Sequence, residues 1–261
     1  MGWLVAFLGS VTVVCGTSLA LANDWPSKPI RIIVSFTAGS ATDILARLVF
    51  QEVSSGTGQS VVIENRGGAG GTIGAAAVAR SAPDGYTMLV NAAGHAAAPW
   101  VYPNLTYDTA KDFAGVTPLA NIPNVLVVSP SSRFTKVDDI ISAARSRPGT
   151  ITYASAGVGT AGHLNSERFR LKAKFEGVHV PFRGAPEAIT EIMAERLDFL
   201  WVPITPALSA IRDGKLRPLA VSTDKRSSAL PDIPSTVELG LPDSSYNFWV
   251  GLFLPAKTPG Y

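Results

Sequence analysis

The chain is poor in the residues from which disulfides and metal sites are built. Its 261 residues include one cysteine and three histidines, and its formal net charge is only +2. The cysteine, Cys15, lies in the apolar N-terminal segment, so we expect no disulfide in the rest of the chain. The histidines stand at positions 95, 163 and 179 without the spacing of metal ligands, and we expect no metal and no cofactor. Because Lys and Arg form no basic cluster, we also expect no nucleic-acid partner.

The first 22 residues contain no charged side chain and end in Ala20-Leu21-Ala22. An apolar run that ends in small residues at this spacing is typical of a secretory signal peptide. We therefore expect residues 1–22 to be cleaved before Asn23 and the mature protein to be periplasmic. The alternative is a membrane anchor, because a run of about 19 apolar residues can span a bilayer.

Beyond this leader, short β-branched runs alternate with Ala-rich windows of helical periodicity. The runs predict strands at Ile30–Ser35, Ser60–Ile63, Tyr86–Asn91, Asn124–Val128, Ile151–Ala154, Val178–Pro181, Leu197–Trp201, Leu216–Val221 and Phe248–Leu254. The windows predict helices at Ala41–Ser54, Thr72–Ser81, Val137–Ser146, Ala161–Lys172, Pro186–Glu195 and Thr205–Asp213. This alternation favours an α/β fold with parallel sheets covered on both faces.

Two stretches share one pattern, in which an apolar strand leads through a loop of small residues into a helix. In the first, Ile30–Val34 is followed by Ser35–Asp43; in the second, Ile151–Ala154 is followed by Ser155–His163. A helix N-terminus presents up to four unpaired N–H groups and about half a positive charge, so each loop can bind an anion. Because the loops lie in different halves of the chain, we expect one anion to be held from both sides.

The first loop contains a capping-box pattern at Ser40–Asp43. The Ser40 hydroxyl is expected to accept from a helix N–H group, and the Asp43 carboxylate from the N–H group of the cap residue. Such a box can also serve only to begin a helix, but the small residues before it leave main-chain N–H groups uncovered. The ligand-binding candidates in this loop are Phe36, Thr37, Ala38, Gly39, Ser40, Thr42 and Asp43.

The second loop is expected to present successive amides, with Thr160 as helix cap and hydroxyl donor. His163 falls in the first helical turn, where the helix dipole disfavours imidazolium, and it is either a ligand contact or a structural residue. Arg183 either binds a second carboxylate or forms a surface ion pair with Glu187. The candidates outside the first loop are Ala93, Gly94, His95, Ser155, Gly157, Thr160, His163, Arg183 and Gly184.

Motifs of nucleotide binding and of catalysis are incomplete. The Gly-rich stretch Gly67–Gly74 departs from the dinucleotide pattern at Ile73, and no phosphate-loop motif occurs. No Gly-x-Ser-x-Gly elbow is present, so we expect no enzymatic activity. The rival interpretation is a secreted serine hydrolase in which Ser40 or Ser155 is the nucleophile.

Several ordered motifs resemble the Bug family, the periplasmic solute-binding components of tripartite tricarboxylate transporters. The motifs are Trp25–Val34, Gly39–Asp43, Glu64–Gly71, Ala82–Tyr86, Pro123–Val128, Ser155–Leu164, His179–Gly184, Gly214–Arg217 and Trp249–Leu252. The resemblance covers essentially the whole mature chain, in the order of the family. It implies a receptor that binds a small carboxylate and delivers it to membrane permease subunits. A ligand-sensing subunit of a membrane signalling system would have the same fold.

The resemblance also implies an α/β, two-lobed periplasmic-binding-protein fold of the type II, Venus-flytrap class. Residues 25–123 would form lobe one, to which 248–261 return, and residues 124–247 would form lobe two, with a ligand cleft between the lobes. Crossing strands near Val125–Val128 and Trp249–Leu254 would form the hinge. Family members continue past the stretch that matches Pro255–Pro259, so a C-terminal part of lobe one is expected to be missing here.

In the family, the first loop contacts the ligand carboxylate, partly through ordered water. Many members also carry an acidic residue shortly after the strand that corresponds to Leu197–Trp201. Here the segment Trp201–Pro203 is apolar. An apolar wall favours an aromatic or plain aliphatic carboxylate over an amino acid. The expected partner is a small carboxylate, with an aromatic carboxylate and a dicarboxylate as the candidates.

Overall fold

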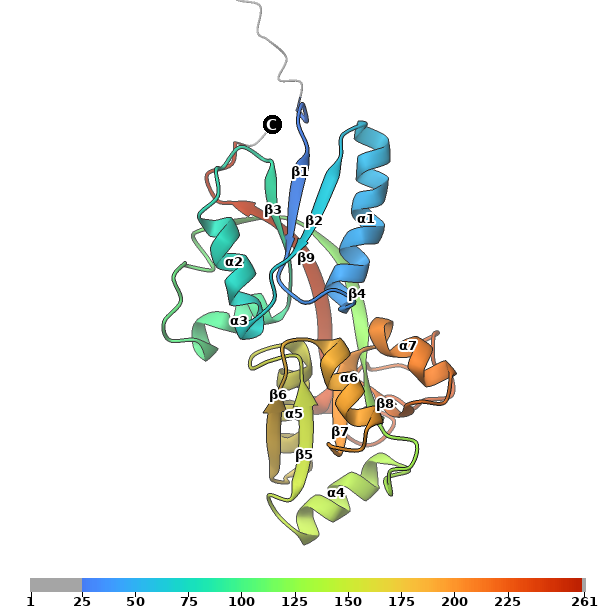
Figure 1. Cartoon of the computed structure of the whole chain (residues 1–261). Helices are drawn as coiled ribbons and strands as arrows, with labels where there is room; N and C mark the ends of the chain where they lie inside the picture. The colour runs from blue at the N-terminus through green and yellow to red at the C-terminus, as the bar shows by residue number, and fades with distance from the viewer. Residues whose placement is uncertain (1–24, 260–261) are drawn as a thin grey trace, which may run out of the picture.

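The computed structural model describes residues 25–259 and shows two lobes connected by long strands (Figure 1). The first lobe contains β1 (Ile30–Val34), α1 (Ala41–Thr57), β2 (Val61–Asn65), the 3₁₀ turn η1 (Ala69–Gly71), α2 (Thr72–Ala79), β3 (Thr87–Ala92) and α3 (Gly94–Val101). The second contains α4 (Val137–Ser146), β5 (Ile151–Ser155), α5 (Ala161–Ala173), β6 (Gly177–Pro181), α6 (Ala185–Met193), β7 (Phe199–Pro203), α7 (Ile204–Arg212), β8 (Arg217–Val221) and the 3₁₀ turn η2 (Pro242–Ser244). The strands β4 (Phe113–Val128) and β9 (Asn247–Pro255) run between them. This architecture confirms the two-lobed α/β fold.

Strand β4 belongs to the sheets of both lobes. Up to Pro123 it pairs antiparallel with β9, and from Asn124 it pairs antiparallel with β7 and β8. The chain returns to the first lobe through Tyr246, whose N–H donates to the carbonyl of Ser222 at 2.8 Å, and then enters β9. The lobe limits expected from the sequence stay a prediction. The change of strand partners after Pro123 supports the expected limit between residues 123 and 124.

The sheets are mixed rather than wholly parallel. Strand β1 pairs in parallel with β2 and β3, and β5 pairs in parallel with β6 and β7, as helical crossovers require. Strands β4 and β9 run antiparallel to the strands with which they pair. One hydrophobic cluster extends through both lobes, from Ile32 and Val90 to Leu200 and Val202, so the core is continuous across the region between them.

Two elements differ most from the expectation. Strand β4 is much longer than the predicted Asn124–Val128. The sequence predicted a short strand because Gly115 and Pro118 interrupt the strand pattern, but the structure accommodates both residues through shifts in the register with β9. Helix α3 was not expected at all, since its sequence begins with Gly94 and contains Pro99. Its burial of small residues against the lobe outweighs this low intrinsic propensity.

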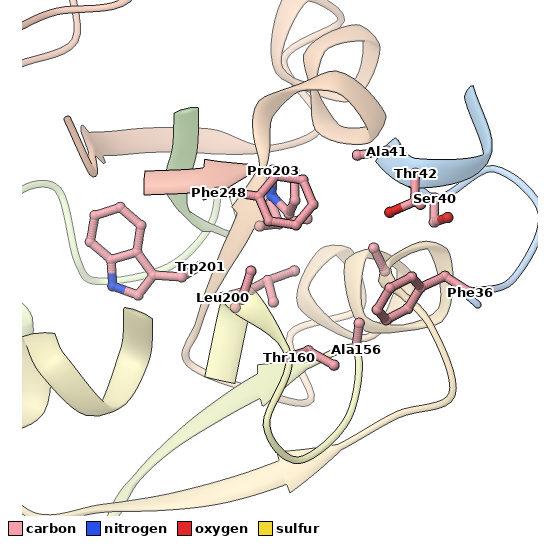
Figure 2. Close-up of a pocket in the computed structure, with 14 residues that line it drawn as sticks. Phe36, Ser40, Ala41, Thr42, Ala156, Thr160, Leu200, Trp201, Pro203 and Phe248 are labelled. Atoms are coloured by element: carbon pink, nitrogen blue, oxygen red, sulfur yellow. The ribbon is translucent and has the colours of Figure 1, made fainter. Parts of the chain in front are cut away.

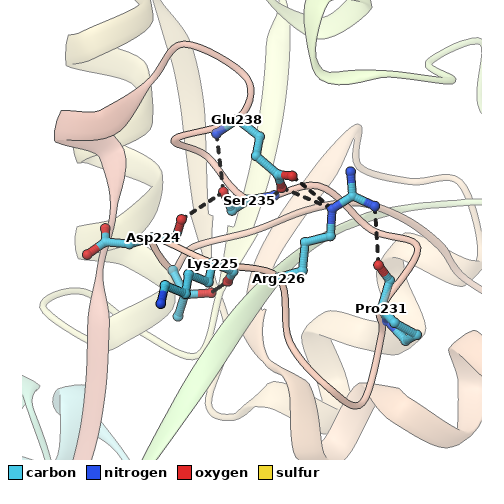
Figure 3. A network of polar contacts seen from close by, with 7 residues as sticks. Asp224, Lys225, Arg226, Pro231, Ser235 and Glu238 are labelled. Atoms are coloured by element: carbon cyan, nitrogen blue, oxygen red, sulfur yellow. Dashed lines mark hydrogen bonds and ion pairs between the residues drawn. The ribbon is translucent and has the colours of Figure 1, made fainter.

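The long segment between β8 and β9 is held by its own polar contacts (Figure 3). The Arg226 guanidinium donates to both carboxylate oxygens of Glu238 at 3.0 and 3.1 Å, and to the carbonyl of Pro231 at 3.2 Å. Glu238 also accepts from the Ser235 N–H at 2.7 Å, and the Ser235 hydroxyl donates to the carbonyl of Asp224. These contacts fix the path by which the chain returns to the first lobe.

Within residues 25–259, no helix combines the length and hydropathy needed to cross a bilayer. The expected signal peptide at residues 1–22 lies outside the described residues.

Candidate functional site

The two lobes touch along a line of small residues. A Cβ placed on Gly184 of the second lobe would overlap the hydroxyl of Thr37 in the first and lie 3.0 Å from its Cβ. A Cβ on Gly94 would lie 2.6 Å from the carbonyl oxygen of Gly159. The Tyr102 hydroxyl donates to the carbonyl of Val158 at 2.8 Å across the same boundary. These contacts define a closed arrangement of the lobes.

A cavity of about 40 Å³ lies between the lobes (Figure 2). Its lining residues are Phe36, Ser40, Ala41, Thr42, Ala156, Thr160, Ala161, Gly162, Ala185, Leu200, Trp201, Val202, Pro203 and Phe248. They come from the first lobe, the second lobe and β9. A site with walls from both lobes changes shape when the lobes move relative to each other.

Three helices begin at this cavity. The N–H groups of Ala41 and Thr42 open α1, those of Ala161 and Gly162 open α5, and that of Ala185 opens α6. Within residues 25–259, none of these five groups donates to a protein acceptor. Because helix N-termini carry partial positive charge, these unpaired donors favour an anion bound between the lobes.

The remaining wall is apolar. Phe36 from the first lobe, Leu200 and Val202 from β7, and Phe248 from β9 line the cavity. The Trp201 ring points away from it (Figure 2) and is buried in a separate cluster of the second lobe. No Asp, Glu, Lys or Arg is among the described lining residues, so recognition of charge rests on main-chain dipoles.

The first loop is held in a partly expected way. Ser40 caps α1, since its Oγ accepts from the Asp43 N–H at 3.2 Å. The expected return bond is wrong: Asp43 Oδ2 accepts from the Gly39 N–H at 2.9 Å, whereas the Ser40 N–H donates to the carbonyl of Thr37. The reason is the left-handed φ of +77° at Gly39, which turns its own N–H toward the carboxylate.

Asp43 is the anchor of this loop. Its side chain is only 4% exposed, and it accepts from Asn65 at 2.8 Å and forms an ion pair with Arg47 at 3.0 Å. Burial opposes ionisation, but hydrogen bonds from Arg47, Gly39 and Asn65, with the charge of Arg47, hold the pKa of Asp43 below its usual value. Asp43 therefore shapes the loop from behind and does not line the cavity.

The second loop is held by hydroxyl groups. Ser155 Oγ accepts from the Gly157 N–H at 3.0 Å, and the Thr160 hydroxyl donates to the carbonyl of Gly157 at 2.7 Å. The expectation that the Thr160 hydroxyl caps the helix is wrong, because this bond turns it back into its own loop. Thr160 still lines the cavity, whereas Ser155 is fully buried behind it.

His163 does not point its hydrogen-bonding nitrogen at the cavity. Its Nδ1 accepts from the Gly159 N–H at 3.1 Å, and its ring lies against that of His179, with centroids 4.2 Å apart. Burial is the largest cause that lowers the pKa of His163, whereas the sequence reasoning assigned this effect to the helix dipole. The sequence did not single out His179, whose Nε2 lies 2.7 Å from Ser155 Oγ.

The ligand-binding candidate His95 does not lie at the cavity. The ring is buried in the first lobe, edge-on to Phe113 at 4.8 Å and Phe253 at 5.1 Å. It does not line the cavity, because α3 carries it to the far side of the boundary contact at Gly94. Ala93 is likewise buried, and its N–H donates to the carbonyl of Trp249 at 3.1 Å, which connects the end of β3 to β9.

Arg183 lies at the rim of the boundary, next to Gly184, and is exposed. The surface ion pair with Glu187 is not formed: the Glu187 carboxylate instead accepts from the main-chain N–H of Arg183 at 3.1 Å. Within residues 25–259, the guanidinium forms no ion pair. Gly184 contacts Thr37 and provides the close approach of the lobes rather than a cavity wall.

Apart from Ala93, His95 and Arg183, the structure sorts most of the candidates into those that line the cavity and those that support or close it. Those that line the cavity are Phe36, Ser40, Thr42 and Thr160. Those that support or close it are Thr37, Gly39, Asp43, Gly94, Ser155, Gly157, His163 and Gly184, while Ala38 is exposed at the edge of the first loop. The sequence reasoning missed Ala41, Ala161, Gly162 and Ala185 as lining residues, although their place in a first helical turn could have identified them. No local pattern identifies Phe248, which reaches the cavity only because β9 returns from the other lobe.

Residues 45–261 match the sequence profile of the tripartite tricarboxylate transporter family receptor. The chain is 36% identical over 265 residues to the UPF0065 protein in the tcbD-tcbE intergenic region of Pseudomonas sp. (strain P51), a match that covers 98% of this chain and 79% of that protein.

Two solved structures are similar in fold and sequence. One, R. palustris Rpa4515 with adipate, is 36% identical with a TM-score of 0.87, over 90% of this chain and 79% of that one. The other, MatC (Rpa3494) from Rhodopseudomonas palustris with bound malate, is 33% identical with a TM-score of 0.85, over 90% and 80% of the two chains.

Proposed function

The chain belongs to the family of tripartite tricarboxylate transporter receptors, which are carboxylate-binding solute receptors and not enzymes, and we propose that it binds an unsubstituted aliphatic dicarboxylate. The observation that carries the proposal is the convergence of three helix N-termini, from both lobes, on one cavity between the lobes. Five unpaired N–H groups can donate to two carboxylates without a charged side chain.

The apolar wall determines which chemical groups are accepted between the two carboxylates of the ligand. Phe36, Leu200, Val202 and Phe248 contact whatever lies between the two carboxylates, and none of them offers a partner to an amine or a hydroxyl. Burial of an unpaired polar group costs more than the loss of one hydrogen bond, so substituted ligands are disfavoured. Of the two ligands held by the similar structures, adipate has such an unsubstituted chain and malate does not.

Entry requires the lobes to separate. The cavity holds only about three water-sized molecules, and its polar lining residues Ser40, Thr42 and Thr160 are no more than 5% exposed. A dicarboxylate that contacts both lobes stabilises a closed state that is widened to fit it. The permease subunits of the transporter would read this closed state, in the periplasm, after removal of residues 1–22.

The serine hydrolase alternative has no support in the site. Ser40 Oγ is occupied as the cap of α1, and Ser155 is fully buried with its hydroxyl among Gly157 and His179. Neither hydroxyl lies exposed beside a general base in the way that a nucleophile requires.

Calorimetric titration of the mature chain tests the proposal. We expect adipate to bind and to be recovered unchanged, hexanoate to bind at least about tenfold more weakly because it leaves one set of N–H groups unpaired, and glutamate to bind weakest. At adipate about 100-fold above its Kd, the free energy of unfolding should rise by about 2.7 kcal/mol. A folded protein that binds no member of a dicarboxylate series would contradict the proposal.

A further inference from the structure

Two histidines lie together behind the second loop, here defined as residues 155–160. His163, in the first turn of α5, accepts from the Gly159 N–H at 3.1 Å through Nδ1. His179, in β6, places Nε2 2.7 Å from Ser155 Oγ. The two rings are 4.2 Å apart between centroids and tilted by 30°. The pair therefore contacts the loop at both ends.

The loop they hold carries the donors of the second lobe. Gly159 has a left-handed φ of +75° and directly precedes Thr160, Ala161 and Gly162, which line the cavity. At the other end, Ser155 Oγ accepts from the Gly157 N–H at 3.0 Å. A shift at Gly159 or Ser155 therefore moves the N–H groups that open α5.

The charged and titratable groups around the pair are few. The Tyr153 ring stacks on His179 at 5.1 Å, and its hydroxyl bonds to the carboxylate of Glu167. Glu167 forms an ion pair with Arg170 at 2.7 Å. The charge of Glu167 favours the protonated form of both rings, and the charge of Arg170 opposes this effect at His163.

We propose that His163 and His179 act as positioning residues that hold the second loop in its ligand-binding shape only while both rings are neutral. Acid then opens the loop and weakens carboxylate binding. The identity of the ligand in this inference rests on the proposed function. The contacts of His163 and His179 with the loop do not depend on that function.

The chemistry follows from the acceptor at His163. Because Nδ1 accepts from Gly159, the neutral ring carries its proton on Nε2. A proton added at Nδ1 would turn this nitrogen into a donor. Two donors would then face each other, and the bond from the Gly159 N–H would break. A proton added to His179 would place a positive charge beside the N-terminus of α5, whose dipole opposes it.

The direction of the pH effect is set by burial. Burial lowers the pKa of His163, and lowers that of His179 to about 4. Both rings are therefore neutral at neutral pH, and the loop is intact there. Binding is expected to weaken as the pH falls from about 6.5, the ordinary value for histidine, toward 4.

Substitution at His163 separates the acceptor from the titration. In His163→Asn, the side-chain oxygen takes the place of Nδ1 as an acceptor but does not titrate, whereas His163→Leu has no acceptor. At neutral pH we expect His163→Leu to bind adipate about tenfold more weakly than wild type and His163→Asn to lose far less. Between about pH 7 and pH 5, wild type should lose affinity more steeply than His163→Asn. Protonation of adipate itself cancels in this comparison.

The third histidine of the chain provides the matched control. His95→Leu removes a ring that is buried in the first lobe, away from the cavity, and should keep the full acid response. An acid response of His163→Asn equal to that of wild type, or wild-type affinity of folded His163→Leu at neutral pH, would overturn the proposal.

A measurement without ligand keeps the two proposals apart. Nitrogen chemical shifts of the three imidazole rings report which nitrogen is protonated, and hydrogen exchange at the Gly159 amide reports its bond to His163. We expect that amide to exchange faster as the rings titrate. If no variant binds adipate, the proposed function fails, while this titration still decides the role of the histidines: a Gly159 amide insensitive to ring protonation would refute it.

Discussion

The two loops that face the cavity have the same sequence pattern but are held by different chemistry. The first, between β1 and α1, is anchored by the buried carboxylate of Asp43, which accepts from Gly39 and Asn65 and pairs with Arg47. The second, between β5 and α5, has no charged anchor and depends on hydroxyl groups and two imidazole rings.

This difference predicts different responses to acid. Asp43 has a lowered pKa, so its stabilisation is present above the ordinary pKa of an aspartate and is lost only as the pH falls through the lowered value. The histidines begin to take up protons at a higher pH. The same arrangement of free N–H groups can therefore be supported by a charged group that resists acid or by neutral groups that do not.

The largest effect is expected where the two lobes touch. Gly184 has an extended backbone, with φ of −168°, so alanine fits there without backbone strain, but its Cβ would overlap the Thr37 hydroxyl. We expect Gly184→Ala to fold, to remain open and to bind adipate at least about 100-fold more weakly, as measured by calorimetry and small-angle scattering.

Two further variants test the cause of this loss. Gly115→Ala adds a Cβ into open space and should bind as wild type. The double variant Thr37→Gly with Gly184→Ala removes the overlapping side chain and should recover part of the affinity. Full binding by Gly184→Ala alone would show that closure does not need this contact.

The next largest effect is expected at the charged anchor. Asp43→Asn removes the charge that pairs with Arg47 and leaves one donor facing another at Gly39 or Asn65. The free energy of unfolding should fall by about 2 kcal/mol, the scale of hydrogen bonds to a charged group. Urea unfolding at several pH values checks this, and the acid-side loss of stability should be shallower in the variant. A variant as stable as wild type would mean that the loop does not depend on the carboxylate.

A smaller effect is expected at the neutral anchor. Thr160→Ala removes the bond from its hydroxyl to the carbonyl of Gly157, and the free energy of unfolding should fall by about 1 kcal/mol. Thr160→Ser keeps the hydroxyl and serves as the control. If Thr160→Ala costs as much as Asp43→Asn, the distinction between a charged and a neutral anchor is incorrect.

The smallest effect is expected at the rim. The exposed Arg183 guanidinium attracts an anion to the open cleft without touching the cavity. Arg183→Ala should slow association by roughly twofold at low salt and leave dissociation unchanged, because exposed charges are screened. Stopped-flow kinetics at two salt concentrations test this. A faster dissociation from the variant would instead place Arg183 on the bound ligand.

Much of the fold could be predicted because its local patterns agree with its tertiary structure. Helix α4 occupies the expected Val137–Ser146, and α1 and α5 begin at the expected Ala41 and Ala161. The loops before those two helices were identified for the same reason, since a strand, small residues and a cap form a local signal. What failed was non-local: nothing near Phe248 indicates that β9 brings it to the cavity.

The site residues show the same limit. Ser40 and Thr160 were expected at the cavity and lie there, and Ser40 caps α1 as expected, but the partners of the Asp43 carboxylate and the Thr160 hydroxyl were assigned incorrectly. Those partners depend on backbone angles, such as the positive φ at Gly39, that the pattern does not determine. His95 was placed on the wrong side because the helix that carries it, α3, was not predicted.

A cavity whose donors are main-chain N–H groups also constrains how such a receptor can change its ligand over evolution. A point mutation to any other residue can remove an arginine from a binding site, but only a mutation to proline can remove the N–H group of Ala41, Thr42 or Gly162. The attraction for carboxylates is thus inherited with the backbone, while Leu200, Val202 and Phe248 are free to vary in size. Gene duplicates of such a chain would diverge toward acids of other lengths and shapes and would keep their preference for acids throughout.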